Sequence, residues 1–135
     1  MSKLWLNAGL GLALLCTSAF ATEAERKQCD RSEIQQLEND ARALVRTGGC
    51  EDVSQCRAAP VGVQACGGPR DYVVYCSVTT NEKALLRALD KLARREERFN
   101  RQCDVISICI FRTPPEIELV NGVCQEVLPS TDTLP

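Results

Sequence analysis

The chain has 135 residues, of which 44% are hydrophobic, 25% are charged and 4% are aromatic, and it contains no histidine. This length indicates one domain, and the lack of imidazole excludes Ser-His and Cys-His nucleophiles, histidine general bases and histidine-ligated zinc. The formal net charge of −2 argues against a protein built mainly to bind nucleic acid.

Residues 1–21 are typical of a secretory signal peptide. Lys3 is the only charged residue before Glu23, and an apolar run over residues 4–16 precedes the small-residue site that ends at Ala21. The run is shorter than the roughly 20 apolar residues that a membrane span needs. We therefore expect cleavage after Ala21, no membrane span in the mature chain, and a periplasmic or secreted protein. Cys16 as a lipid anchor is the less favoured alternative.

The mature chain is expected to form one disulfide-rich domain over residues 22–128, with a disordered tail over 129–135. It begins with a predicted helix over residues 31–46, because apolar residues recur there at helical spacing and Gly48-Gly49 follow as a stop signal. Residues 50–71 show no periodicity and hold three cysteines. They predict a long loop that crosslinks tie to the rest of the domain.

Three further segments carry clear patterns. Residues 72–78 are rich in strand-forming side chains and predict a strand. Apolar residues at helical spacing predict a long amphipathic helix over residues 82–102. Residues 105–111 are apolar on both faces, which is typical of a central strand.

The last predicted element is a hairpin. Asn121-Gly122, a strong hairpin signal, separates two predicted strands over residues 116–120 and 123–127. The order is thus helix, loop, strand, helix and three strands. It predicts an α+β domain in which two helices pack on one small, mostly antiparallel sheet.

Nine cysteines are present, and removal of the signal peptide takes away one of them. The other eight predict up to four disulfides, because an exported chain meets an oxidising compartment. A metal site is the alternative, but the zinc-ribbon spacing Cys-x-x-Cys is missing, and we expect neither metal nor cofactor. The eight are Cys29, Cys50, Cys56, Cys66, Cys76, Cys103, Cys109 and Cys124.

Two pairings follow from the predicted elements. The hairpin turns Cys124 inward, and the strand expected beside it carries Cys109, so we expect a Cys109–Cys124 disulfide between adjacent strands. Cys103 lies on the apolar side of the second helix. Either Cys76 or Cys29 could reach it, and we favour Cys76.

The chain contains several short motifs that are found together in one family of proteins. They are Thr47-Gly48-Gly49-Cys50, Cys56-Arg57, Cys66-Gly67-Gly68-Pro69 followed by Tyr72, Asn100-Arg101, and Ile106 to Cys109. In these motifs the chain resembles a family of small secreted bacterial domains with a C-G-G-P-x-x-Y segment and no assigned activity. The resemblance covers residues 47–124. It implies the fold boundaries and bacterial export, and it implies no function.

The second predicted helix has a basic face opposite its apolar side. Residues 82–101 hold seven basic and four acidic side chains. The basic face consists of Arg87, Lys91, Arg94, Arg98 and Arg101. It would suit an acidic protein partner or an anionic envelope polymer. The alternative, which we favour, is a solvated helix face with ion pairs at i,i+4 spacing.

Glu96 interrupts the apolar side of this helix. A buried carboxylate without a partner would be costly. We therefore expect Glu96 at the rim of the core, and the alternative is a buried Glu96 paired with an arginine.

A second candidate surface is the loop of Gly67, Gly68, Pro69 and Arg70. The glycines permit positive φ and the proline fixes the next turn, while a disulfide at Cys66 would stiffen the loop. A rigid loop with an exposed Arg70 would suit a protease inhibitor, because ordering before binding lowers the entropy cost. The favoured alternative is a β-turn that leads into the next strand.

The sequence contains no nucleophile elbow and no Ser-x-x-Lys motif, so we expect no enzyme. We predict an exported, non-catalytic binding module of the inhibitor or immunity type, which acts on an envelope or secreted partner. The partner would be a protein or an anionic envelope polymer, not nucleic acid. The alternatives are a structural or stress-related envelope protein and a small hydrolase. Two carboxylates facing each other in a cleft would favour the hydrolase.

Overall fold

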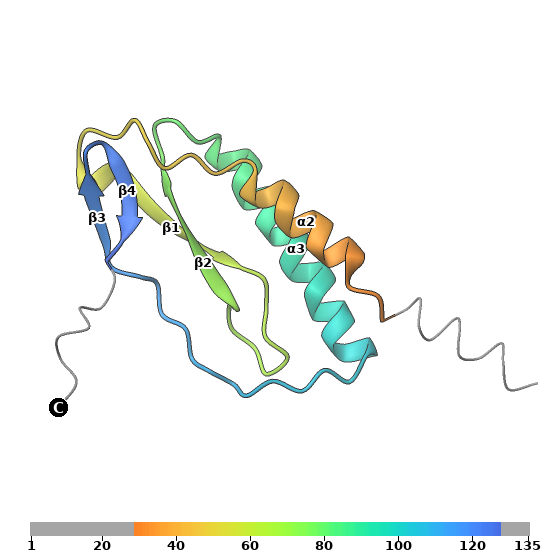
Figure 1. Cartoon of the computed structure of the whole chain (residues 1–135). Coiled ribbons are helices and arrows are strands. Elements are labelled where there is room, and N and C mark those ends of the chain that lie inside the picture. The colour runs from red at the N-terminus through yellow and green to blue at the C-terminus, as the bar shows by residue number, and fades with distance from the viewer. Residues whose placement is uncertain (1–28, 128–135) are drawn as a thin grey trace, which may run out of the picture.

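The computed structural model describes residues 29–127, so the predicted signal peptide and the predicted tail lie outside the described residues. Two helices lie side by side, a two-stranded ribbon packs against them, and a second small ribbon sits at the far end (Figure 1). In chain order the elements are α2 (Ser32–Arg42), the 3₁₀ turn η1 (Val53–Gln55), β1 (Cys56–Val61), β2 (Asp71–Cys76), α3 (Glu82–Gln102), β3 (Ile117–Val120) and β4 (Val123–Glu126).

The long helix α3 has the bounds that its periodicity predicts. Asn81 caps its start by accepting a hydrogen bond from the Ala84 amide. The buried side of α3 faces α2 and β1 and carries Leu85, Leu89, Leu92 and Phe99. This stripe at i, i+4 and i+7 spacing is what a helix packed along one side requires.

The first helix is shorter than predicted, since α2 ends at Arg42 rather than at residue 46. The next residues leave the helix because Arg46 turns toward the end of β2. The Arg46 amide donates to the Thr80 hydroxyl, and the Arg46 carbonyl accepts from the Cys76 amide. These tertiary hydrogen bonds replace the helical ones.

The strands form two antiparallel pairs, not the single sheet expected. β1 pairs with β2, with Cys56 opposite Cys76, and β3 pairs with β4. The α+β class with two helices and antiparallel pairing is confirmed. β1 lies inside the segment predicted to be a loop; Pro60 and the lack of alternation conceal this strand, whose pairing with β2 defines it.

The hairpin between β3 and β4 is confirmed, as is the turn at Asn121-Gly122. Both turn residues have positive φ, 50° and 76°, as a type I′ turn requires. Leu119 lies opposite Cys124 in the register, and the Cys124 side chain is buried. The hairpin therefore turns Cys124 inward, as expected.

Two buried clusters hold the domain together. The larger one fills the space between the helices and the β1–β2 ribbon, and Ile34, Val61 and Leu92 are among its fully buried side chains. The smaller one consists of Cys50, Cys56, Cys76 and Cys124, joined in two disulfides. Among the described residues, no helix combines the length and apolar character that crossing a bilayer requires.

Candidate functional site

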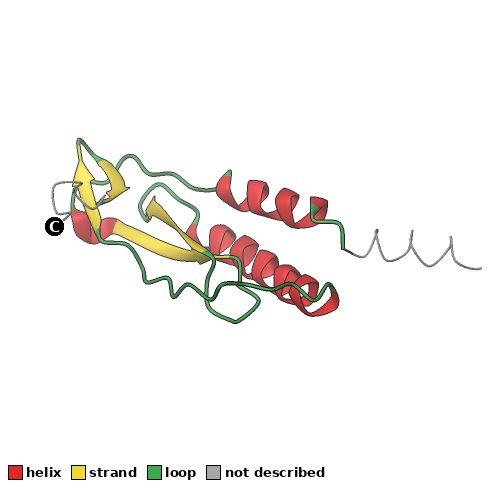
Figure 2. Cartoon of the chain, turned by 60° about the horizontal axis from the view of Figure 1, so that its bottom comes forward, coloured by secondary structure: helices red, strands yellow, loops and turns green. Residues whose placement is uncertain are grey.

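The most unusual surface is the segment between α3 and β3, which we call the strap and define as residues 104–112. The sequence predicts a central strand over residues 105–111 of this segment, but the strap forms neither helix nor strand and runs along one edge of the domain (Figures 1 and 2). Its apolar side chains face solvent. The exposed fractions are 94% for Ile106, 85% for Ile108, 49% for Ile110 and 89% for Phe111.

Between residues 105 and 108 the side chains alternate between the domain and solvent, whereas Cys109, Ile110 and Phe111 are all exposed. Ile106, Ile108 and Ile110 are exposed, whereas Val105 and Ser107 are partly buried. A period of two is the signature of an extended backbone. Residues 105–108 thus have the side-chain arrangement of a strand, and the isoleucines of the strap have no covering layer in the described part of the chain.

Disulfides and hydrogen bonds hold the strap, among them bonds from the Val105 amide to the Asn100 carbonyl and from the Ser107 hydroxyl to Gln64 Oε1. Cys109 is bonded to Cys66 in the loop after β1. The Gln64 side chain donates to the Ile110 carbonyl at 2.7 Å, and the Tyr72 hydroxyl donates to the Arg112 carbonyl at 3.5 Å. The second disulfide, Cys29–Cys103, lies just before the strap. A cavity of about 370 Å³ separates the strap from the domain, with Arg31, Val63, Arg70 and Asn100 in its wall.

These bonds correct the predicted disulfide pairings. Cys109–Cys124 is wrong, because β1 brings Cys56 to Cys124 and leaves Cys109 to pair in the loop after β1. Cys76–Cys103 is also wrong, since Cys76 at the end of β2 bonds Cys50.

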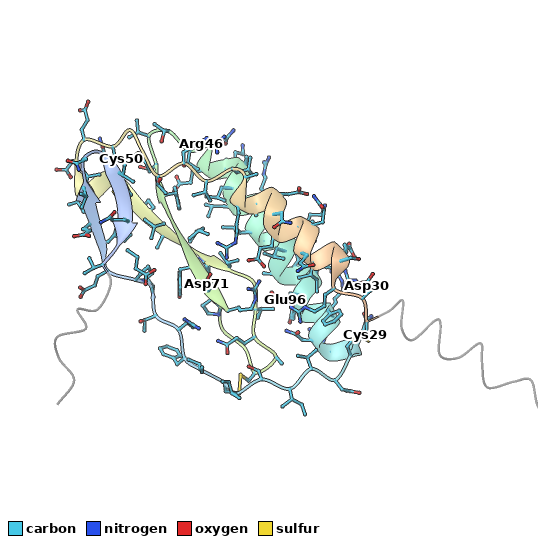
Figure 3. All side chains as sticks on the ribbon, viewed as in Figure 1. Cys29, Asp30, Arg46, Cys50, Asp71 and Glu96 are labelled. Atoms are coloured by element: carbon cyan, nitrogen blue, oxygen red, sulfur yellow. A yellow bond between two sulfur atoms is a disulfide. The ribbon has the colours of Figure 1, made fainter. Side chains whose placement is uncertain are left out.

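The alternative partner of Cys103 is the observed one. Cys29 lies beside the last turn of α3 (Figure 3) and bonds Cys103 with a Cα–Cα distance of 5.7 Å. Cys103 is partly rather than fully buried and packs at the edge of the main core. The bond joins the start of α2 to the end of α3.

The loop of Gly67, Gly68, Pro69 and Arg70 forms the turn that was the favoured alternative. Gly67 and Gly68 have φ of 95° and 77°, and both are exposed. Arg70, however, is not an exposed tip. Its side chain points back into the domain and bonds two glutamates, so the inhibitor surface predicted around Arg70 is not formed there.

Glu96 is the centre of that ion-pair network and is 1% exposed, so placement at the rim is wrong and pairing with arginine is confirmed. Arg31 Nη2 and Arg70 Nε each donate to Glu96 Oε1 at 3.1 Å. The Val63 amide donates to Glu96 Oε2 at 3.0 Å. Glu96 lies on the side of α3 that faces the loop after β1 (Figure 3), and it fixes that loop to both helices.

Gly62 allows this approach. A Cβ at this position would lie 2.2 Å from Glu96 Oε2, and the φ of Gly62 is +64°. Both the space and the backbone conformation therefore call for glycine. Gly62 thus lets the loop that carries Cys66 lie directly against the buried carboxylate.

Arg70 also joins Glu96 to Glu38. Arg70 Nη2 donates to Glu38 Oε2 at 2.5 Å. Burial opposes ionisation of Glu38, but hydrogen bonds and positive charge from Arg70 and Arg42 outweigh it and lower the pKa of Glu38. The two carboxylates meet around a shared guanidinium, which is the geometry of a structural ion-pair network.

The basic face of α3 is exposed along its whole length, as expected. Arg94 pairs with Asp90, and Arg101 pairs with Glu97 at 2.7 Å, both at i,i+4 spacing. The other members, Arg87, Lys91 and Arg98, form no ion pair with the rest of residues 29–127. The solvated helix face accounts for these features, and three of its positive charges have no ion-pair partner within residues 29–127.

The sulfur atoms of Cys50, Cys76 and Cys124 lie within 4.8 Å of one another. Each of them is already bonded in a disulfide. Disulfide sulfurs are not thiolates, and only thiolates bind zinc strongly. The cluster is therefore a pair of neighbouring crosslinks: Cys56–Cys124 fastens the β3–β4 hairpin to β1, and Cys50–Cys76 fastens the segment before η1 to the end of β2.

Comparisons of the chain with protein-family models, with curated proteins and with solved structures give no match. The resemblance drawn from the cysteine and glycine motifs stays a prediction. Function must therefore be argued from the surface itself. Sequence patterns missed the strap as a surface, although its alternating isoleucines between two cysteines are a signal of a crosslinked extended segment.

Proposed function

We propose that the mature chain is an exported, non-catalytic binding module that engages an envelope or secreted protein through the strap. The observation that supports this is the exposed row of Ile106, Ile108, Ile110 and Phe111. Exposed contiguous apolar patches larger than roughly a few hundred Å² mark interaction sites on soluble proteins. The patch lies on a crosslinked segment, so little conformational freedom remains to be lost on binding.

The same observation favours this function over the two alternatives. A structural envelope protein without a discrete site has no need for four apolar side chains in water. A hydrolase with paired carboxylates needs an acid and a base free to react with substrate, whereas Glu38 and Glu96 are held by arginines. The four disulfides are consistent with an extracytoplasmic protein, and the signal sequence supports a periplasmic or secreted site.

The test is capture of a partner by the oxidised mature protein from envelope and secreted fractions, with bound species identified by mass. A strap variant, Ile106→Asp with Phe111→Asp, is compared with Val78→Asp. Val78 is 62% exposed and lies in the turn between β2 and α3, on the opposite side of the domain from the strap (Figure 1).

The proposal expects a partner that binds the unchanged protein and Val78→Asp but not the strap variant. Equal capture by the strap variant would overturn it. Loss of capture on charge reversal of Arg94 and Arg98, with the strap variant still active, would assign binding to the basic face and would also overturn it. The strap variant and the charge reversal of Arg94 and Arg98 change only exposed side chains. Each should therefore leave the free energy of unfolding within about 0.5 kcal/mol of that of the unchanged protein.

A further inference from the structure

Part of the strap is fastened at both ends. Cys103 is bonded to Cys29, and Cys109 is bonded to Cys66, so residues 104–108 form a five-residue span between two crosslinks. Ile106, the most exposed apolar side chain of the described domain, stands at the middle of this span. The span therefore presents Ile106, with Ile108 beside it, from a short, doubly anchored segment.

The backbone of the span is also open to a partner. Asp104 and Cys109 have positive φ, 47° and 51°, so the chain turns at each end of the span. The amides of Ile106 and Ile108 donate no hydrogen bond to any other residue in the described range. An extended segment with unpaired amides can add as a strand to the edge of another protein.

We propose that residues 104–108 are a substrate-like segment that occupies and inhibits an endopeptidase selective for branched aliphatic side chains. Ile106 enters the specificity pocket of the enzyme. This proposal rests on the proposed function, and it specifies an endopeptidase as the partner of the binding module. Endopeptidases bind extended segments, and one pocket selects the side chain beside the bond to be cut. The exposed row also offers Ile108 to a neighbouring subsite on the same side.

The double anchorage explains why the segment would inhibit rather than be consumed. Hydrolysis of the Ile106–Ser107 bond adds water across one peptide bond, giving one carboxylate and one amine. Cleavage in a free peptide lets these ends diffuse apart. Here Cys29–Cys103 and Cys66–Cys109 keep both ends on the same domain at high effective concentration. The cut ends stay in the active site of the enzyme. Resynthesis of the Ile106–Ser107 bond therefore competes with dissociation of the cut inhibitor.

The test uses three purified endopeptidases, selective for branched aliphatic, for aromatic and for basic side chains, each with a short fluorogenic substrate. We expect inhibition of the aliphatic-selective enzyme and inhibition about 100-fold weaker for the basic-selective one. Ile106→Asp should abolish inhibition. Ile106→Lys should transfer it to the basic-selective enzyme, a gain that an unfolded variant could not produce. Val78→Asp, an equally drastic change at an exposed apolar residue away from the strap, is the matched control and should change little.

The crosslink gives a second readout. With Cys66 and Cys109 both changed to serine, the span should become a substrate that is cut after Ile106 and no longer inhibits. Lack of inhibition across the three enzymes, or inhibition that Ile106→Lys does not redirect, would overturn the proposal. A captured partner that is not a peptidase but is lost with the strap variant would uphold the binding module and refute the peptidase assignment.

Discussion

Removal of the Glu96 carboxylate is the most informative single perturbation of the domain. Glu96→Ala takes the acceptor from the partly buried Val63 amide and one partner each from Arg31 and Arg70. Breaking a buried ion pair costs about 3–5 kcal/mol. The Arg31 and Arg70 side chains are 50% and 35% exposed, so they can bind water once Glu96 is gone. We therefore expect the free energy of unfolding to fall by about 3 kcal/mol, the lower end of this range. That is a large part of the free energy of unfolding of a typical domain, which is ~5–15 kcal/mol.

The neighbouring Glu97 supplies the control. It pairs with Arg101 on the exposed side of α3, and its side chain is 56% exposed, so Glu97→Ala should cost about 0.5 kcal/mol or less. Glu96→Gln keeps one carbonyl oxygen as an acceptor, so its loss of unfolding free energy should lie between those of Glu96→Ala and Glu97→Ala. Unfolding in guanidinium under non-reducing conditions, followed by circular dichroism, gives the three values. A Glu96→Ala protein within about 0.5 kcal/mol of the unchanged one would refute the network as a source of stability.

Three further predictions follow from single sites. Gly62→Ala would force a methyl group against Glu96 at a positive φ, and thermal unfolding should show a loss of about 2–4 kcal/mol; an unchanged Tm would contradict the close approach. Burial, together with the hydrogen bond that the Tyr75 hydroxyl donates to the Glu82 carboxylate, raises the pKa of Tyr75 to about 12. Because the folded state holds this proton more tightly, stability is full below pH 10 and falls by about 2–3 kcal/mol as pH rises to 12; Tyr75→Phe should flatten that decline. Finally, limiting reductant followed by thiol labelling should modify Cys66 and Cys109 first, because both are exposed; initial labelling of a buried cysteine would show that the strap is not the accessible crosslink.

Local patterns predicted the elements whose structure depends on local physics. The helical repeat of apolar residues gave α3 with its observed bounds, and Asn121-Gly122 gave the hairpin and its register. Both signals come from residues that lie within a few positions of one another. The fold class followed from the order of these elements.

Long-range partners decided what sequence patterns missed. β1 is a strand because β2 pairs with it, although Pro60 lies within it. Glu96 is buried because Arg31, 65 positions away, reaches it. Residues 105–108 have the alternation of a strand, yet the bond from Cys109 to Cys66 holds the strap at the edge of the domain. In each case the deciding residue lies far away in the chain, and no spacing rule identifies it.

A peptide map of the oxidised protein without reduction tests the central claim most directly, because the strap is a surface only if Cys109 is bonded to Cys66. The account predicts crosslinked peptides that contain Cys66–Cys109 and Cys29–Cys103. Recovery of Cys109–Cys124 instead would place the strap against β4, cover its isoleucines and contradict the proposed binding surface.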